Sequence, residues 1–406
     1  MYGAVHSKSG IGFNIVPDDI PLLWLERLSA NGMKRVRIYE PLGDLDIIFP
    51  LLRRAKALGV YAVGALPYSL SPVHTDELYA QNTRDLIKEA GVDAIMLKDA
   101  GGLLTPDRIR TLVPAIRRAM PAGMPLELHS HCTTGLAPLV YLESVGLGVD
   151  ALHTSIAPLA NGEAQPATQT MIRNLRDRGY RVDLDEDLIA SISETLGQIA
   201  DQEGKPVGVP KAYDAFHYEH QAPGGMQSNF RLSLAEAGLS DKFDDVLREC
   251  ARIRADLGWP IMITPFAQFV GTQAVLNVVH GERYRVVPDE VKKYALGYYG
   301  KLLAPVDPLV LEKIIANGSQ DIALVPPEIP PALPALRAKY PDASDEERLL
   351  RYAFPGSQID DMLAAGPIAQ RYELLPPVVQ LIRGLRGSGL RDVSLQYGNT
   401  RLALRV

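Results

Sequence analysis

Short apolar runs alternate with amphipathic helical stretches along the first 157 residues, and this alternation limits the fold more than any other feature. Helical stretches such as 44–59 and 78–91 separate five runs that have the length and composition of buried strands, at residues 34–42, 60–69, 93–100, 125–133 and 149–157. Strands that alternate with helices form parallel sheets, so the pattern predicts an α/β protein built from βα units. A weaker apolar run at residues 2–6 adds a sixth strand, whereas a closed (β/α)8 barrel needs eight.

Two histidines and a lysine follow neighbouring predicted strands, at the ends where parallel strands gather functional side chains. His129 and His131 are two residues apart after the apolar run PLEL, so their side chains point to the same face and can share one ion. A pair of half-buried histidines held by hydrogen bonds would show the same spacing. Lys98 occupies the matching place on the preceding strand, and an inward lysine is unfavourable unless it is paired or chemically modified. The lysine therefore favours a metal site over the structural alternative.

The alternation of strands and helices stops after residue 158. Residues 183–300 are mainly helical in pattern, and the frequent prolines at 304–336 indicate a stiff wrapping segment. A helical pair is expected at 344–364, and a hairpin near the C-terminus with its turn at Gly398 and Asn399. We expect three parts, namely a partial barrel with the metal site, a helical extension, and a proline-rich segment with the helical pair and hairpin, at residues 1–165, 166–303 and 304–406.

The composition argues against a membrane or a nucleic acid as a partner. The chain has 406 residues and a net charge of -6, with no dense basic cluster of the kind that binds nucleic acid. No apolar run reaches the roughly 18 residues that a membrane-spanning helix needs, and Met1 opens no basic and then apolar leader. Cys132 and Cys250 are too few for a disulfide framework. These features predict a cytoplasmic protein.

Five separated segments are distinctive: SPVHT, KDAGGLLTP, HSHCTTG, APGGMQSNF and TPFAQFVGTQAVLNVVHGERY, which begin at residues 71, 98, 129, 222 and 264. In this order they resemble the carboxyltransferase family of pyruvate carboxylase, the oxaloacetate decarboxylase alpha subunit and the transcarboxylase keto-acid subunit. The resemblance covers roughly residues 6–365 and is closest to the oxaloacetate decarboxylase branch. It implies a (β/α)8 TIM-type barrel, here incomplete at the N-terminus, followed by a mostly helical carboxylase extension that funnels a biotin arm to the barrel mouth.

The resemblance also implies roles for individual residues. Lys98 matches a lysine that becomes carbamylated and bridges the metal, and His129 and His131 match the two imidazole ligands. Two nitrogens with oxygen donors suit zinc, with manganese and cobalt as alternatives. Thr264 matches a hydroxyl that relays a proton between biotin and the enolate of the keto acid. A cap or turn hydroxyl is the structural alternative for Thr264.

The chain departs from the family pattern around the substrate. The family's first strand, which carries an aspartate as fourth metal ligand, and its second strand are not found, so the chain enters the barrel near the third strand. His6 stands where that strand carries an arginine for the keto-acid carboxylate, while Glu40 and His153 stand where the family has aspartates. His6, Glu40 and Tyr39, which ends a strand, are the predicted substrate-binding residues. The missing strands predict that a second chain completes the barrel, or that the chain pairs with itself across the gap.

The function implied is carboxyl transfer between carboxybiotin and a small α-keto acid such as pyruvate or oxaloacetate, or decarboxylation of oxaloacetate by the same steps. No lysine between two methionines offers an attachment point for biotin, so biotin is expected in trans on a biotin carrier protein. Two alternatives stay open: a metal-dependent aldolase or lyase that uses no biotin, and a non-catalytic subunit needed for assembly. A homo- or hetero-oligomer is expected.

Overall fold

Six parallel strands form one sheet, in which strands that follow one another in the sequence are neighbours in space. The computed structural model describes residues 2–8, 14–236, 238–367, 379, 382, 385, 392–397 and 400–405. The strands are β1 (Tyr2–His6), β2 (Arg35–Tyr39), β3 (Tyr61–Pro67), β4 (Ala94–Asp99), β5 (Leu126–Ser130) and β6 (Ala151–Leu152). The five predicted strands and the weaker sixth are thus confirmed. Within the described ranges β1 and β6 do not pair, so the barrel is partial, as the resemblance implies.

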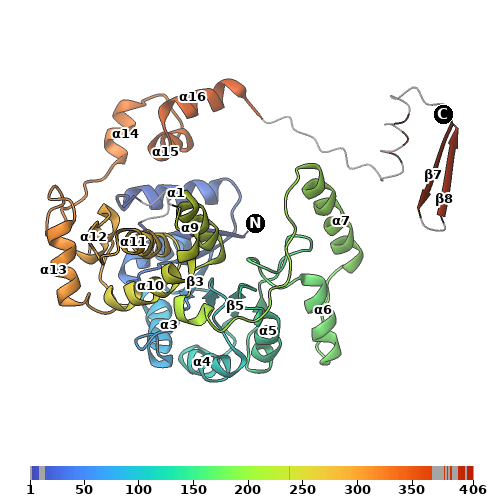
Figure 1. Cartoon of the computed structure of the whole chain (residues 1–406), viewed down its shortest axis with the longest axis horizontal. Coiled ribbons are helices and arrows are strands. Elements are labelled where there is room, and N and C mark those ends of the chain that lie inside the picture. Colours follow the sequence, from blue (N-terminus) through green and yellow to red (C-terminus); the bar gives the residue numbers. More distant parts are fainter. Residues whose placement is uncertain are drawn as a thin grey trace.

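Helices cover the outer face of this sheet (Figure 1). They are α1 (Asp19–Ala30), α2 (Phe49–Ala57), which follows the short helix η1 (Leu45–Ile47), α3 (Asp76–Ala90), α4 (Pro106–Ala119) and α5 (Ala137–Gly146). Thr75 and Thr105 begin α3 and α4 as N-caps, because their hydroxyls accept from the N–H groups of Leu78 and Arg108. The apolar faces of these helices and the outward side chains of the strands form the larger core.

The inner face of the sheet has a different composition. Small or slender side chains, namely Val63, Ala65, Ala94 and Met96, line its middle and pack against three tyrosines. Longer polar side chains occupy the ends of the strands. This leaves room inside the partial barrel for the functional residues described below.

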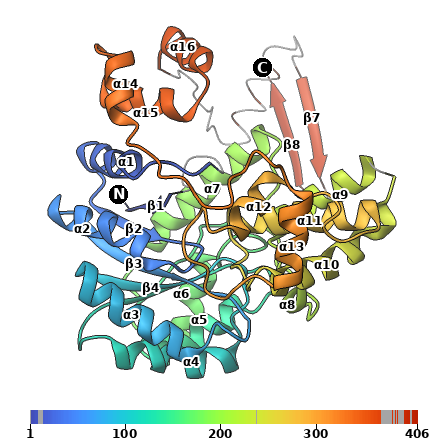
Figure 2. The same cartoon turned by 90° about the vertical axis from the view of Figure 1, so that its left-hand side faces the viewer.

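A second group of helices forms the extension with a core of its own. Figure 2 shows α9 to α13 gathered beside the sheet. The core lies among α9 (Gly224–Glu236), α10 (Phe243–Asp256), α11 (Phe266–His280) and α12 (Asp289–Ala295), with the short helices α8 (His217–His220) before α9 and η2 (Ser240–Lys242) before α10. Helices α6 (Thr168–Asp177) and α7 (Glu186–Gln202) precede this group and are not part of its core, and Met171 of α6 packs in the larger core. Arg254 of α10 is buried and donates to Ser69 Oγ at 3.0 Å and to Leu70 O at 3.3 Å, which ties the extension to the loop after β3.

The proline-rich segment differs from the expectation of a stiff wrapping segment or linker without a core. Helix α13 (Pro308–Asn317) lies within it, and Val310 and Ile314 are buried in the core of the extension. Asp307 caps this helix and Pro308 occupies its first turn, where a proline is well tolerated. The remaining helices are α14 (Leu333–Lys339), α15 (Asp345–Ala353) and α16 (Gly356–Ala365). The last two confirm the predicted helical pair.

The C-terminal hairpin is present as two antiparallel strands, β7 (Asp392–Tyr397) and β8 (Thr400–Arg405). Its predicted turn at Gly398 and Asn399 lies outside the described residues. Among the helices that the structure describes, none is long and apolar enough to cross a membrane.

Candidate metal centre

Lys98 and His129 lie side by side at the carboxyl ends of β4 and β5, where the strand register pairs them. His131 follows just beyond β5, and its backbone N–H donates to the carbonyl oxygen of Asp99 at 3.1 Å. The Nε2 atoms of His129 and His131 are 3.1 Å apart. The three predicted metal ligands therefore occupy one edge of the sheet.

The turn after β4 fixes the backbone on which these residues stand. Asp99 is fully buried, and its carboxylate accepts from the N–H groups of Leu103 and Leu104 at 2.8 and 2.9 Å. Gly102 has a φ of +67°, and a Cβ at this residue would lie 2.6 Å from the carbonyl oxygen of His131. Only glycine permits both this φ and this close approach. The KDAGG motif thus shapes the backbone of a predicted ligand.

Burial keeps the two histidines neutral. It lowers the pKa of His129 to about 2, helped by the charges of His131 and Lys98. Burial also lowers the pKa of His131. The pKa of Lys98 falls to about 8, first because its ammonium is desolvated and then because Arg37 is near. A cation binds neutral imidazoles, and a carbamate forms on a deprotonated amine. The lowered pKa values of the two histidines and of Lys98 therefore suit a metal site.

A chain of contacts joins this centre to the extension. The ammonium of Lys98 lies 4.4 Å from the ring centre of Tyr39, and the rings of Tyr39 and His6 meet edge to face at 4.8 Å. Nε2 of His6 lies 3.2 Å from the carbonyl oxygen of Thr264, just before α11. The side chain of Thr264 is exposed, and its hydroxyl accepts from Gln268 at 3.2 Å. The structure thus connects Lys98, Tyr39, His6 and Thr264.

Glu40 lies apart from these residues. It follows Tyr39 directly, and its carboxylate accepts from the Ser7 hydroxyl at 3.4 Å and from the N–H of Asp44 at 3.2 Å. Burial raises the pKa of Glu40 to about 8. Its neighbours in a narrow pocket include His74 and Tyr79, not the histidine pair. No described contact therefore supports its predicted role in substrate binding.

Three interior residues near the ligands are not among the site residues predicted from the sequence. Glu127 is fully buried and contacts His153, which in turn lies 3.3 Å from His129. Arg37 acts through its charge on both histidines that are predicted as ligands, and its Nε is buried without a hydrogen-bond partner among the described residues. The alternation of side chains along a strand could have identified two of these residues as interior. Glu127 is two residues from His129 and Arg37 is two residues from Tyr39, so each pair shares a face of its strand.

The residues present fit a divalent cation. In the part of the chain that the structure describes, no three His, Cys, Asp or Glu side chains gather closely enough to form a metal site by themselves. The two Nε2 atoms at 3.1 Å nevertheless have the separation expected of neighbouring imidazole ligands, since zinc–nitrogen bonds are about 2.1 Å long. Lys98 would supply a third ligand as a carbamate.

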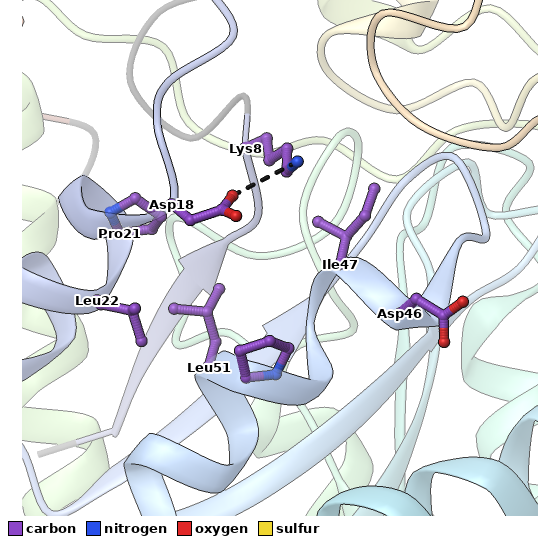
Figure 3. Close-up of a pocket in the computed structure, with 8 residues that line it drawn as sticks. Lys8, Asp18, Pro21, Leu22, Asp46, Ile47 and Leu51 are labelled. Atoms are coloured by element: carbon purple, nitrogen blue, oxygen red, sulfur yellow. Dashed lines mark ion pairs between the residues drawn. The ribbon is translucent and has the colours of Figure 1, made fainter. Parts of the chain in front are cut away.

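A pocket of about 250 Å³ lies between the start of α1 and the η1–α2 segment. Figure 3 shows Lys8 paired with Asp18 across it, at 3.4 Å. Its lining includes Leu22, Ile47 and Leu51 but none of the predicted ligands. The pocket is therefore separate from the candidate metal centre.

Fold and cluster together define a barrel-type α/β protein with an imidazole pair and a lysine at the carboxyl end of its parallel sheet. Two family models match, one described as HMGL-like at residues 53–196 and one as conserved carboxylase domain at residues 218–373. A pyruvate carboxylase subunit from Methanocaldococcus jannaschii is 36% identical over 348 residues, which are 84% of this chain and 61% of that protein. The methylmalonyl-CoA carboxyltransferase 5S subunit of Propionibacterium freudenreichii subsp. shermanii is 30% identical over 386 residues, covering 95% and 73%.

The chain therefore belongs to the carboxyltransferase family of pyruvate carboxylase and transcarboxylase, as the resemblance indicated. The carboxyl transferase domain of Rhizobium etli pyruvate carboxylase has the same fold, with a TM-score of 0.79 at 22% identity, covering 99% of this chain and 70% of that one. The chain spans 61%, 54% and 47% of the length of three curated relatives.

Proposed function

We propose that this chain is the carboxyltransferase subunit of a biotin-dependent enzyme that acts on a small α-keto acid. The observation that carries the proposal is the pair of Nε2 atoms at 3.1 Å beside Lys98, in a chain of this family. Lys98 as a carbamate, His129 and His131 would hold a divalent cation, for which we favour zinc over manganese and cobalt. When bound, the cation would act as a Lewis acid toward the keto-acid carbonyl.

The other residues have roles in binding and proton transfer under this proposal. The guanidinium of Arg37 and the ring of His6 face the interior and would bind the carboxylate of the keto acid. Tyr39 covers Lys98 and would limit the access of water to the site. Thr264 Oγ1 is exposed at the junction with the extension, where it can accept a proton from the methyl carbon of the keto acid and donate one to N1 of biotin.

The wider assignments belong to the same proposal. The boundaries at residues 165 and 303, a cytoplasmic location, an oligomer, a biotin carrier protein and a chain that completes the barrel are predictions. The state of the cysteines supports the location, because Cys132 and Cys250 are both buried and unpaired. A biotin carrier is supported by the family to which the chain belongs.

Thr264 offers the sharpest test. The full chain is purified from cells grown with zinc, its metal content and the mass of the peptide with Lys98 are measured, and oxaloacetate decarboxylation is followed with and without free biotin. We expect bound metal, an added mass of one CO2 on Lys98 and turnover that depends on biotin. Thr264→Ala should lower kcat by about 10²–10⁴-fold, while Thr264→Ser retains most of it. Metal content should not change.

The control is Thr111→Ala, at an exposed position of α4. Turnover of keto acids without biotin would identify a lyase and overturn the proposed carboxyl transfer. A chain that binds neither metal nor CO2 would be an assembly subunit without catalysis. Equal kcat values for wild type and Thr264→Ala would remove Thr264 from the proton path.

A further inference from the structure

A buried carboxylate lies close to the predicted ligand pair. Glu127 is on β5 two residues before His129, so both side chains enter the barrel from the same face. Its carboxylate accepts from the Tyr2 hydroxyl at 2.9 Å and from Nε2 of His153 at 2.9 Å, and it also contacts Arg35. Because an ionised carboxylate can only accept, all three partners must donate to it.

This arrangement determines which ring nitrogens carry protons. Glu127 accepts from Nε2 of His153, so this nitrogen carries an N–H. Nδ1 of His153 faces Nδ1 of His129 at 3.3 Å, with the two rings perpendicular at 90°. The amide nitrogen of Gln165 can only donate to Nε2 of His129, so the lone pair of this neutral ring lies on Nε2 and its single N–H lies on Nδ1, facing His153.

The second ligand is held in the same tautomer by the backbone. Nδ1 of His131 lies 2.6 Å from the carbonyl oxygen of Glu163, which can only accept. The lone pair of His131 thus also lies on Nε2, facing that of His129 at 3.1 Å. The amide nitrogen of Gln165 lies 3.4 Å from Nε2 of His129. Two lone pairs that face each other are stable when a cation or a donor lies between them.

We propose that Glu127 and His153 are a positioning pair, which fixes the tautomer and the orientation of His129 for a divalent cation. The inference rests on the proposed metal site and adds to it two residues that touch neither the ion nor the substrate. Ligand histidines commonly donate their second nitrogen to a carboxylate, a carbonyl or water. Here a carboxylate acts through a second imidazole.

A purely structural role makes a different prediction. Glu127 and His153 also connect distant strands, since the rings of Tyr2 and His153 meet edge to face at 5.8 Å. If they only brace the barrel, any substitution that weakens the brace should lower stability and metal affinity together. If they position His129, affinity should depend on whether an acceptor faces its Nδ1.

Two amide substitutions separate these roles. The amide of His153→Asn falls near the position of Nδ1 and can still accept from His129. The amide of His153→Gln falls near Nε2 and reaches Glu127 but not His129. Co²⁺ affinity is measured on the full chain by competition with a chelator in bicarbonate buffer, together with the visible Co²⁺ spectrum and the thermal midpoint. We expect His153→Gln to weaken Co²⁺ binding by about 10–100-fold and to change the spectrum.

His153→Asn should restore affinity to within roughly threefold of wild type and keep its spectrum. Tyr2→Phe is the matched control, because it removes another donor to Glu127 without a contact to His129. Equal losses for Asn and Gln, or a loss for Tyr2→Phe as large as for Gln, would overturn the positioning role. A wild-type chain that binds no Co²⁺ would instead contradict the proposed metal site.

Discussion

The hydroxyl of Tyr2 on β1 donates a 2.9 Å hydrogen bond to Glu127 on β5, across the interior of the sheet. Three strands lie between β1 and β5 in the order of the sheet, so this contact requires strong curvature. A twisted parallel sheet of βα units curls in this way toward a barrel. Polar side chains from opposite ends of the open sheet thereby meet in one place, next to the predicted ligand His129.

The first prediction concerns the stability of the metal-free protein and Lys98. Its pKa is lowered to about 8, so the folded state binds the lysine proton less tightly than the unfolded state. As the pH falls from 10.5, the pKa of an unfolded lysine, to about 8, the free energy of unfolding decreases. Below about pH 8 it stays low. Lys98→Met removes this penalty and should stabilise the chain by up to about 3 kcal/mol at pH 7, from the size of the shift.

Urea unfolding at pH 7 and near pH 10, in buffer free of CO2 and metal, measures this effect. The gain should shrink at the higher pH, where the lysine of the unfolded chain also loses its proton. Lys88→Met, at a side chain that is 81% exposed, is the control and should leave the free energy of unfolding unchanged. A Lys98→Met chain no more stable than wild type at pH 7 would show that the amine is well solvated or paired.

The strands, and the placement of Lys98, His129 and His131 at one edge of the sheet, could be predicted because they depend on local pattern. Alternation within one strand places His129 and His131 on one face, and parallel register places Lys98 beside them. The contact between Tyr2 and Glu127 depends instead on how strongly the whole sheet curves, because three strands lie between β1 and β5, and no local pattern gives that curvature. The sequence therefore shows which residues face the interior, but not which of them are in contact across the sheet.

The same alternation explains why Tyr39 and Glu40 have different surroundings. Adjacent residues of an extended chain face opposite sides, so Glu40, which follows the last residue of β2, points away from the side chain of Tyr39. The structure places Tyr39 against Lys98 and Glu40 against Asp44. Helix α13 was not predicted for another reason, because the high proline frequency outweighs the short capping pattern of Asp307 and Pro308.

The second prediction follows from the burial of Glu40. Its pKa is raised to about 8, so the folded state binds the carboxyl proton more tightly than the unfolded state does. Stability should therefore fall as the pH rises through the unfolded value near 4.5 and level off above about pH 8. Glu40→Gln stays neutral and should be more stable than wild type by up to about 4 kcal/mol at pH 8, from the size of the shift, with little difference at pH 4.5.

Urea midpoints at the two pH values test this, with Glu77→Gln as control because that side chain is 80% exposed. Glu77→Gln should show no gain that grows with pH. A Glu40→Gln variant whose advantage is the same at both pH values would contradict the raised pKa. Because Glu40 has no contact with the histidine pair, metal affinity should be unchanged in this variant.

The third prediction uses a glycine to move a ligand without replacing it. A Cβ on Gly102 would meet the carbonyl oxygen of His131 at 2.6 Å, and the φ of +67° adds strain. Gly102→Ala should therefore displace the backbone of His131 and weaken Co²⁺ binding by on the order of tenfold or more, since ligands tolerate errors of only about 0.5 Å.

Gly123→Ala is the matched control, because Gly123 has a φ of +79° with nothing within 4 Å of the added Cβ. Both variants should lose about 1 kcal/mol of stability from backbone strain, but only Gly102→Ala should lose affinity. Urea unfolding and chelator competition on the full chain distinguish the two effects. If Gly102→Ala binds Co²⁺ as wild type does, then either the turn yields or His131 is not a ligand. Co²⁺ binding by His131→Ala decides between these explanations, because a true ligand cannot be removed without loss of affinity.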